Sequence, residues 1–381
     1  MKKIISGIVI TALAFSVVGN SVIVTAKSPE VTENIISHEI SDRIPEDATR
    51  LVEQQLDSII KVSKDFSKDL DIDETQLEEV SIGTPYIIYD VADTKQDEIY
   101  HYPIINNKNE EVVLMVNVMG TTDGWHYDIS TENISKLNVL NYANEEYIFY
   151  GTEGNIIAEN DETKKTLIGN NENVAIQEFE NSDLSKKVDA ISERIDKLQK
   201  TDVNSSVKRN LKFAYSPKVV DVEVGTGKKC ELYNRQTQGS YGLCWAASVA
   251  TISNYLNGTN YTACQIADKE GIGYNDGVYG PAAVLKAMED FGVPYHIVAA
   301  TLLWSEIKSK IVSKIPIYIA ANSNDGGHST VLYGYKNKNG TQYIVMWNPG
   351  SAETQIVEYA GSYTTYSYVN TTFKWTESIY M

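Results

Sequence analysis

The excess negative charge of this chain lies entirely in its first half. Residues 27–210 carry 18 basic and 38 acidic side chains, whereas residues 211–381 carry 13 of each. With 381 residues the chain is also too long for one compact core of ordinary size. This step in composition therefore predicts two units with different roles. The net charge of −18 argues against nucleic acid as a partner, because phosphate binding needs clustered cations.

The first 26 residues have the pattern of an export signal. Met1-Lys2-Lys3 is cationic, the stretch from Ile4 to Val24 is mostly apolar, and Val24-Thr25-Ala26 resembles a signal peptidase site. A membrane anchor is the alternative, but Gly19-Asn20-Ser21 interrupts the apolar stretch near its end. We therefore expect a signal peptide over 1–26, a secreted extracellular protein and no membrane association after cleavage.

The rest of the first half has helical patterns at its two ends and strand patterns between them. Apolar spacing predicts amphipathic helices over about 46–69 and 183–200. Between them, runs rich in Val, Ile and Tyr alternate with turn-forming residues, which predicts antiparallel strands. The clearest runs are 85–89, 111–118 and 146–150. This half has three scattered histidines, no cysteine and no catalytic cluster.

The second half begins after a polar, aperiodic stretch over 201–226, which we expect to join the two units. Its helical patterns come first, and its strand patterns follow. We expect helices over about 244–256, 280–291 and 304–314. We expect strands at 316–320, 329–335, 343–347, 354–359 and 363–369. Helices followed by an antiparallel sheet define an α+β fold.

The most informative stretch is Gln238-Gly239-Ser240-Tyr241-Gly242-Leu243-Cys244-Trp245-Ala246-Ala247-Ser248. Its two glycines permit a sharp turn, and an apolar helix begins at Cys244. Unpaired N–H groups and partial positive charge at a helix start stabilise a thiolate, the nucleophilic form of cysteine. The Gln238 side chain and the Cys244 backbone N–H are candidate donors to the oxyanion formed when the thiolate attacks a carbonyl.

A catalytic thiol needs a base and a group that orients the base. His328 lies where a loop enters a predicted strand, in Gly326-Gly327-His328-Ser329-Thr330, and Asn348 ends the next predicted strand. If the two strands form a hairpin, Asn348 returns beside His328. Its side-chain oxygen can then accept from one ring N–H while the other nitrogen faces Cys244. His296 has no such context, so we expect a structural or surface role for it.

These three motifs resemble papain-like cysteine proteases. The resemblance implies a papain-like fold with Cys244 as nucleophile, His328 as base, Asn348 as orienting residue and Gln238 as oxyanion donor. Plant and lysosomal members have a Trp after the Asn, whereas Pro349 follows it here. They also have a disulfide cysteine at the position of Tyr241.

The compact spacing and the long preceding segment resemble the secreted bacterial branch typified by the staphopains. The segment from Cys264 to Ala267 also resembles related bacterial effector proteases. This resemblance implies an acidic, half-barrel prosegment over 27–210, acting as intramolecular inhibitor, and a catalytic domain over 211–381. The substrates would be proteins or peptides. Tyr274 and residues 277–281 are candidates for one wall of the substrate pocket.

The three cysteines also allow one disulfide besides a free catalytic thiol. By elimination, Cys230 and Cys264 are the candidate pair. No cluster of His, Cys and Asp has the spacing of metal ligands, so we expect no metal and no cofactor.

Two other functions remain open at this point. A different Cys–His acyl-transfer enzyme, such as a transglutaminase or a cell-wall amidase, also places Cys at a helix start. Those enzymes usually complete the triad with Asp or a second His, and they do not place Gln six residues before Cys. An adhesin or toxin module on an inactive papain fold is the third possibility, and the joint presence of all four site residues argues against it.

Overall fold

The computed structural model describes twelve stretches of the chain. These are 44–90, 99–142, 147–152, 155–159, 164–168, 175–178, 227–278, 280–293, 295–298, 300–324, 326–368 and 370–381. The predicted signal peptide, the predicted helix over 183–200 and the predicted junction over 201–226 lie outside these residues. Within the described stretches, no helix combines the length and the apolar character needed to cross a membrane.

The described part of the first half, residues 44–178, is called the N-terminal unit below. It opens with α3 (Glu46–Asp65) and α4 (Ser67–Leu70), which confirm the predicted helix except for a break at Phe66. Val52 and Ile59 of α3 are buried, as the apolar spacing predicts. The remaining elements are η1 (Glu74–Leu77), β1 (Val80–Ile82), β2 (Ile88–Asp90), β3 (Ile99–Asn106), β4 (Glu111–Thr121), β5 (Gly124–Ser130), α5 (Ile134–Val139), β6 (Ile148–Thr152), β7 (Asn155–Glu159), β8 (Lys164–Ile168) and β9 (Ala175–Glu178).

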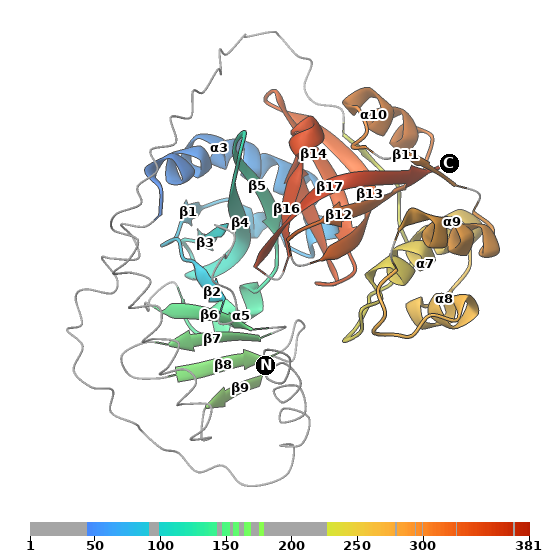
Figure 1. Ribbon diagram of the computed structural model, residues 1–381. Coiled ribbons are helices and arrows are strands. Elements are labelled where there is room, and N and C mark those ends of the chain that lie inside the picture. Colours follow the sequence, from blue (N-terminus) through green and yellow to red (C-terminus); the bar gives the residue numbers. More distant parts are fainter. Residues whose placement is uncertain are drawn as a thin grey trace.

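The second half, described from residue 227 onward and called the C-terminal domain, has helices first and strands afterwards (Figure 1). It contains β10 (Lys228–Lys229), α7 (Cys244–Asn257), α8 (Ala263–Glu270), α9 (Pro281–Asp290), β11 (His296–Val298), α10 (Trp304–Val312), β12 (Ile317–Asn322), β13 (Gly327–Lys338), β14 (Thr341–Asn348), β15 (Glu353–Glu358), η2 (Gly361–Tyr363), β16 (Thr365–Tyr368) and β17 (Thr371–Tyr380). The α+β prediction is confirmed.

The two longest elements of this domain that were not anticipated are a helix and a strand. Helix α8 begins with a capping box in which Thr262 and Gln265 bond each other's backbone N–H. This T-x-x-Q signal is present in the sequence. Strand β17 is the other, and it lies between β12 and β11 near one end of the sheet.

One large antiparallel sheet runs through both halves of the molecule. Its strand order is β1-β3-β4-β5-β15-β14-β13-β12-β17-β11, with β10 and β16 paired at its sides. The two halves meet where β5 pairs with β15, with Ile129 opposite Ile356 and Asp128 opposite Val357. A second sheet, β2-β6-β7-β8-β9, lies wholly within the N-terminal unit. The first half therefore adds four strands, β1, β3, β4 and β5, to the large sheet.

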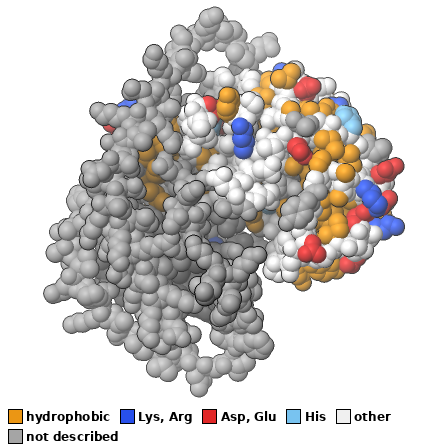
Figure 2. Space-filling view, viewed as in Figure 1, with side chains coloured by type: hydrophobic (Ala, Val, Ile, Leu, Met, Phe, Trp, Pro, Cys, Tyr) orange, Lys and Arg blue, Asp and Glu red, His pale blue; other side chains and the backbone are white. Residues whose placement is uncertain are grey.

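Opposite charges meet at the same junction. The buried carboxylate of Asp69, in α4, pairs with Lys229 and accepts a hydrogen bond from Arg235 at 2.8 Å. Asp65, in α3, pairs with Lys336 at 3.1 Å. The acidic unit thus supplies carboxylates, and the C-terminal domain supplies cations. On the face seen in Figure 2, acidic and basic side chains of the C-terminal domain are interspersed.

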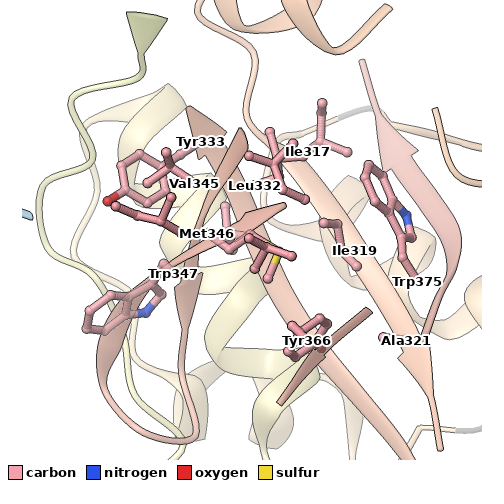
Figure 3. Packing of buried hydrophobic residues seen from close by; sticks show 14 of the residues in the cluster. Ile317, Ile319, Ala321, Leu332, Tyr333, Val345, Met346, Trp347, Tyr366 and Trp375 are labelled. Atoms are coloured by element: carbon pink, nitrogen blue, oxygen red, sulfur yellow. The ribbon is translucent and has the colours of Figure 1, made fainter. Parts of the chain in front are cut away.

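The core of the C-terminal domain lies between its sheet and α7. Ile319 of β12, Leu332 of β13 and Met346 of β14 are buried together in this core (Figure 3). Helix α7 is buried along nearly its whole length, from Trp245 to Asn254. This burial fixes the helix start, and with it Cys244, against the sheet.

The predicted disulfide is wrong, because all three cysteines are free thiols. Cys230 is buried, and its thiol forms a hydrogen bond with Tyr255. Cys264 lies half-buried on α8 beside Tyr274. Elimination failed because it assumed that any cysteine outside the site has a partner, whereas a buried cysteine also serves as a small apolar residue.

Candidate active site

Cys244 is the first residue of α7, as the sequence predicts. No side chain caps this helix start, so the N–H groups of its first turn remain directed toward the thiol. The preceding turn uses Gly239 at a φ of +60°, in the left-handed region that favours glycine. A Cβ on Gly242 would lie 3.4 Å from the Asn275 carbonyl oxygen, so the two loops pack closely.

The pKa of the Cys244 thiol results from opposing causes. Burial raises it and is the largest cause, while hydrogen bonds from Ser329 and from the N–H groups of Trp245 and Cys244 lower it. The helix start thus favours the thiolate as expected, but burial outweighs it and the net pKa is raised. In the full-length chain the thiol is therefore the favoured form at neutral pH.

His328 and Asn348 are brought together by the β13–β14 hairpin, as predicted. The strands pair with Val331 opposite Trp347. The Nε2 of His328 donates to the Oδ1 of Asn348 over 2.8 Å. Both residues are buried, with His328 4% exposed.

The next residue along the strand connects this pair to the nucleophile. Ser329 follows His328 in β13, and its backbone and side chain both form hydrogen bonds with the sulfur of Cys244. The Ser329 hydroxyl is itself fixed by the Tyr318 hydroxyl at 2.6 Å. The start of α7 therefore abuts β13 at the residue that follows His328.

Aromatic rings surround the imidazole of His328. Tyr368 stacks on it with a centroid distance of 4.4 Å and an interplanar angle of 19°, and Phe373 lies 5.5 Å away. This burial lowers the pKa of His328 to about 4, opposed by the hydrogen bond to Asn348, which raises it. The imidazole is therefore neutral at pH 7 in the full-length chain.

Gln238 lies on a loop that packs against the end of β14. Its backbone N–H donates to the Pro349 carbonyl at 3.0 Å, and the Trp347 indole N–H donates to the Gln236 carbonyl at 2.8 Å. Among the described residues, no hydrogen-bond partner is found for the buried Oε1 of Gln238. The turn after Asn348 thus positions the segment that carries Gln238.

The other sequence-based candidates have mixed outcomes. His296 is exposed and packs edge-on against Tyr380, away from the four residues above. In the proposed pocket wall, the Tyr274 ring lies 5.2 Å from the Tyr241 ring, beside the nucleophile loop. Tyr279 lies outside the described residues. Within the described stretches, no group of three or more His, Cys, Asp or Glu side chains could hold a metal ion.

Two neighbours of the site, one buried and one half-buried, were not predicted. Gln355 of β15 accepts a hydrogen bond from Asn348 at 3.1 Å, and Tyr368 of β16 stacks on His328. Gln355 occupies one position in an ordinary alternating strand, and Tyr368 is one of 25 tyrosines. No local pattern in the sequence distinguishes either residue. Gln355 is only seven residues from Asn348, whereas Tyr368 lies 40 residues beyond His328.

The comparisons with known proteins concern the second half of the chain. Residues 228–364 match the family described as "Papain-like cysteine protease AvrRpt2". No curated protein matches the chain.

Two solved structures align with part of the chain. One is digestive procathepsin L 3 of the Tenebrio molitor larval midgut, at 13% identity over 39% of this chain and 69% of that chain, with a TM-score of 0.29. The other comes from work on the mite allergens Blo t 1 and Der p 1, at 14% identity, 44% and 73% coverage and a TM-score of 0.27.

The family match spans the segment that bears all four candidate site residues. It includes Cys244 at the start of α7 and the hairpin that joins His328 to Asn348. Over residues 228–364 the chain therefore matches the papain-like cysteine protease family.

Proposed function

We propose that this protein is a secreted cysteine endopeptidase made as a zymogen, with Cys244, His328, Asn348 and Gln238 as its catalytic residues. The observation that carries the proposal is the 2.8 Å hydrogen bond from His328 Nε2 to Asn348 Oδ1. This bond leaves the other ring nitrogen of His328 for the thiol. Cys244, at an uncapped helix start, meets the same strand one residue further on.

The proposed reaction transfers an acyl group to sulfur and then to water. His328 takes the proton of the Cys244 thiol, and the thiolate attacks the carbonyl carbon of the scissile peptide bond. The imidazolium then gives this proton to the leaving amine, which leaves a thioester on Cys244. Water, deprotonated by His328, attacks the thioester, releases the carboxylic acid and restores the thiol.

Gln238 is proposed to stabilise the oxyanion together with the Cys244 backbone N–H. We expect Gln238→Ala to lower kcat by about 10²- to 10³-fold, the usual cost of removing one oxyanion donor. KM should change little, because the donor acts on charge that develops only in the transition state. Steady-state hydrolysis of a peptide substrate measures both constants. A fall in kcat of less than about threefold would assign the oxyanion donor to another group.

Casein hydrolysis tests the proposed function directly. The processed protein should degrade casein, and an epoxide that alkylates thiols should block the activity. Mass spectrometry of the inactivated protein should find the adduct on Cys244 and on neither Cys230 nor Cys264. Ammonia release in the presence of an amine acceptor, without casein cleavage, would instead support a transglutaminase. Absence of both activities would support an inactive papain-fold module.

The zymogen part of the proposal is supported by the contacts between the two halves. Strand β5 extends the catalytic sheet beyond β15, and Asp69 is buried against two cations of the C-terminal domain. Burial also keeps Cys244 protonated and His328 neutral at pH 7, which is a resting state rather than a reactive ion pair. An N-terminal unit held in this way suits an intramolecular inhibitor that stays bound until the chain is cleaved.

Cleavage is expected between Thr201 and Gly227, because exposed polar connections are the preferred sites of proteolysis. Lys208-Arg209 offers a basic site for a trypsin-like activator. Purified Cys244→Ala precursor, treated with traces of trypsin or of active enzyme, should yield a fragment whose N-terminus lies in this range. N-terminal sequencing checks the position. Cleavage inside 84–180, with 201–226 intact, would show that the domain boundary lies elsewhere.

A further inference from the structure

A third buried amide side chain, Gln355, lies behind the His328–Asn348 pair. Gln355 is on β15, the strand next to β14, and its side chain is fully buried. Its Oε1 accepts a hydrogen bond from Asn348 Nδ2 at 3.1 Å. Its Nε2 donates to the backbone carbonyl of Ser367, on β16, at 2.8 Å. Hydrogen bonds thus link four groups one after another: His328, Asn348, Gln355 and Ser367.

The backbone carbonyl of Ser367, at the end of this series of hydrogen bonds, determines which atom donates and which accepts in each of them. The Ser367 carbonyl can only accept, so Gln355 must present its NH₂ group to it and its oxygen to Asn348. Asn348 must then present its own NH₂ group to Gln355 and its oxygen to His328. The His328 nitrogen that faces this oxygen must carry a proton, which is Nε2. The other nitrogen, Nδ1, is left unprotonated in the neutral ring and can accept a proton.

A second backbone group supports the same orientation. The Gly350 N–H donates to Asn348 Oδ1 at 2.9 Å, and an N–H can only donate. Asn348 is therefore held at its oxygen by Gly350 and at its nitrogen by Gln355. The Gly350 bond alone leaves the amide free to rotate about that contact, whereas Gln355 adds a second fixed point inside the core.

We propose that Gln355 is a positioning residue for the catalytic base, acting through Asn348 to keep the proton of His328 on Nε2 and its Nδ1 free to accept. The kinetic consequence rests on the proposed peptidase function. The consequence for the proton position on His328 does not, because it follows from the hydrogen bonds alone. The two can therefore be measured separately.

In the full-length protein, the N-terminal unit forms hydrogen bonds with the last residue of this hydrogen-bonded series, Ser367. The Ser367 N–H donates to Asp128 Oδ2 at 2.6 Å, and Asp128 Oδ1 accepts from Asn117 Nδ2 at 2.8 Å. Asp128 is on β5 and fully buried. Strand β16, which supplies the Ser367 carbonyl to Gln355, is thus held in register by a residue of the other half.

The proton position is measured by nitrogen-15 NMR of histidine. The Cys244→Ala precursor, labelled only on its histidine side chains, keeps the imidazole neutral at pH 7.5. His328→Gln identifies the His328 signals among the five histidines. We expect the Nε2–H tautomer in this protein and a mixture of both tautomers when Gln355→Met is added. Methionine has a similar size but neither donates nor accepts as the amide does.

Kinetics of the processed enzyme provide the second measurement. Gln355→Met should lower kcat by about 10- to 100-fold and change KM little, because a supporting hydrogen bond is lost while the substrate site is intact. Gln355→Glu keeps the acceptor for Asn348 but donates to Ser367 only when its carboxyl group is protonated. Its kcat should therefore approach the wild-type value in acid and fall as pH rises, whereas the loss in Gln355→Met should not follow this pH dependence.

Val357→Ala is the matched control, because Val357 is on the same strand and is equally buried. It should lower thermal stability while the His328 tautomer and kcat stay at wild-type values. A single Nε2–H tautomer in Gln355→Met, or a kcat within about threefold of wild type, would overturn the proposal. If the wild-type protein has no peptidase activity, the tautomer measurement decides alone. If Gln355→Met does not fold, the pH profile of Gln355→Glu decides.

Discussion

Cys244→Ala should abolish peptide-bond hydrolysis, with a fall in kcat of at least about 10⁴-fold. The thiol forms the covalent intermediate, and alanine offers no nucleophile in its place. Folding should be unaffected, since alanine suits a helix start and the variant loses only the sulfur's hydrogen bonds with Ser329 and with the N–H groups of Trp245 and Cys244. Peptide hydrolysis and thermal unfolding, measured on the same preparation, separate the two effects.

Cys264→Ala is the control for this substitution. Cys264 is also a free, half-buried thiol near the start of a helix, α8. Its removal should leave hydrolysis within about twofold of wild type, because Cys264 lies on α8 beside Tyr274 and is not one of the proposed catalytic residues. Activity above background in Cys244→Ala would contradict the assignment of the nucleophile. A large loss of hydrolysis in Cys264→Ala would indicate that Cys264 takes part in the reaction.

The parts of the site that could be predicted from sequence are those fixed by local structure. The glycines and the apolar helix pattern correctly predicted a helix that begins at Cys244 and a loop before it that carries Gln238. Two neighbouring strands joined by a short loop form a hairpin, and that hairpin places Asn348 beside His328. In each case the spacing along the chain decides the geometry, because helices and hairpins form between residues close in sequence.

The parts that could not be predicted depend on pairing between distant segments. Tyr368 stacks on His328 from β16, a strand 40 residues further along the chain that pairs with β17 and not with β13. Gln355 is close to Asn348 along the chain, on the next strand, but the sequence does not show that the two amide side chains meet. The junction of β5 with β15 joins residues more than 200 positions apart. Alternation within a strand shows that a residue faces inward, but it does not show which strand lies beside it.

The net direction of the pKa shift at Cys244 also could not be predicted from the sequence. Its position at a helix start correctly indicated stabilisation of the thiolate, but burial by the surrounding sheet has the larger effect. The extent of burial is a property of the whole fold. It also bears on the zymogen proposal, because the same full-length chain holds both Cys244 and His328 in their neutral forms.

His328→Ala in the processed enzyme is expected to lower kcat/KM by about 10³- to 10⁶-fold at pH 7, the range found when a catalytic base is removed. Without the base, attack requires a thiolate formed in solution. The ordinary pKa of a cysteine thiol is about 8.5, so without His328 only a small fraction of the Cys244 thiol is ionised at this pH. The residual activity should therefore rise about tenfold per pH unit until the pKa of the thiol is reached.

The wild-type enzyme should not show this steep rise, because His328 supplies the proton acceptor at neutral pH. His296→Ala is the matched control, since His296 is the other histidine of the C-terminal domain and is exposed against Tyr380. Its kcat/KM and pH profile should equal those of the wild type. A fall of less than about tenfold in His328→Ala, or a residual activity independent of pH, would show that another group takes the thiol proton. The Asn348–Gln355 chain would then orient a ring that is not the base.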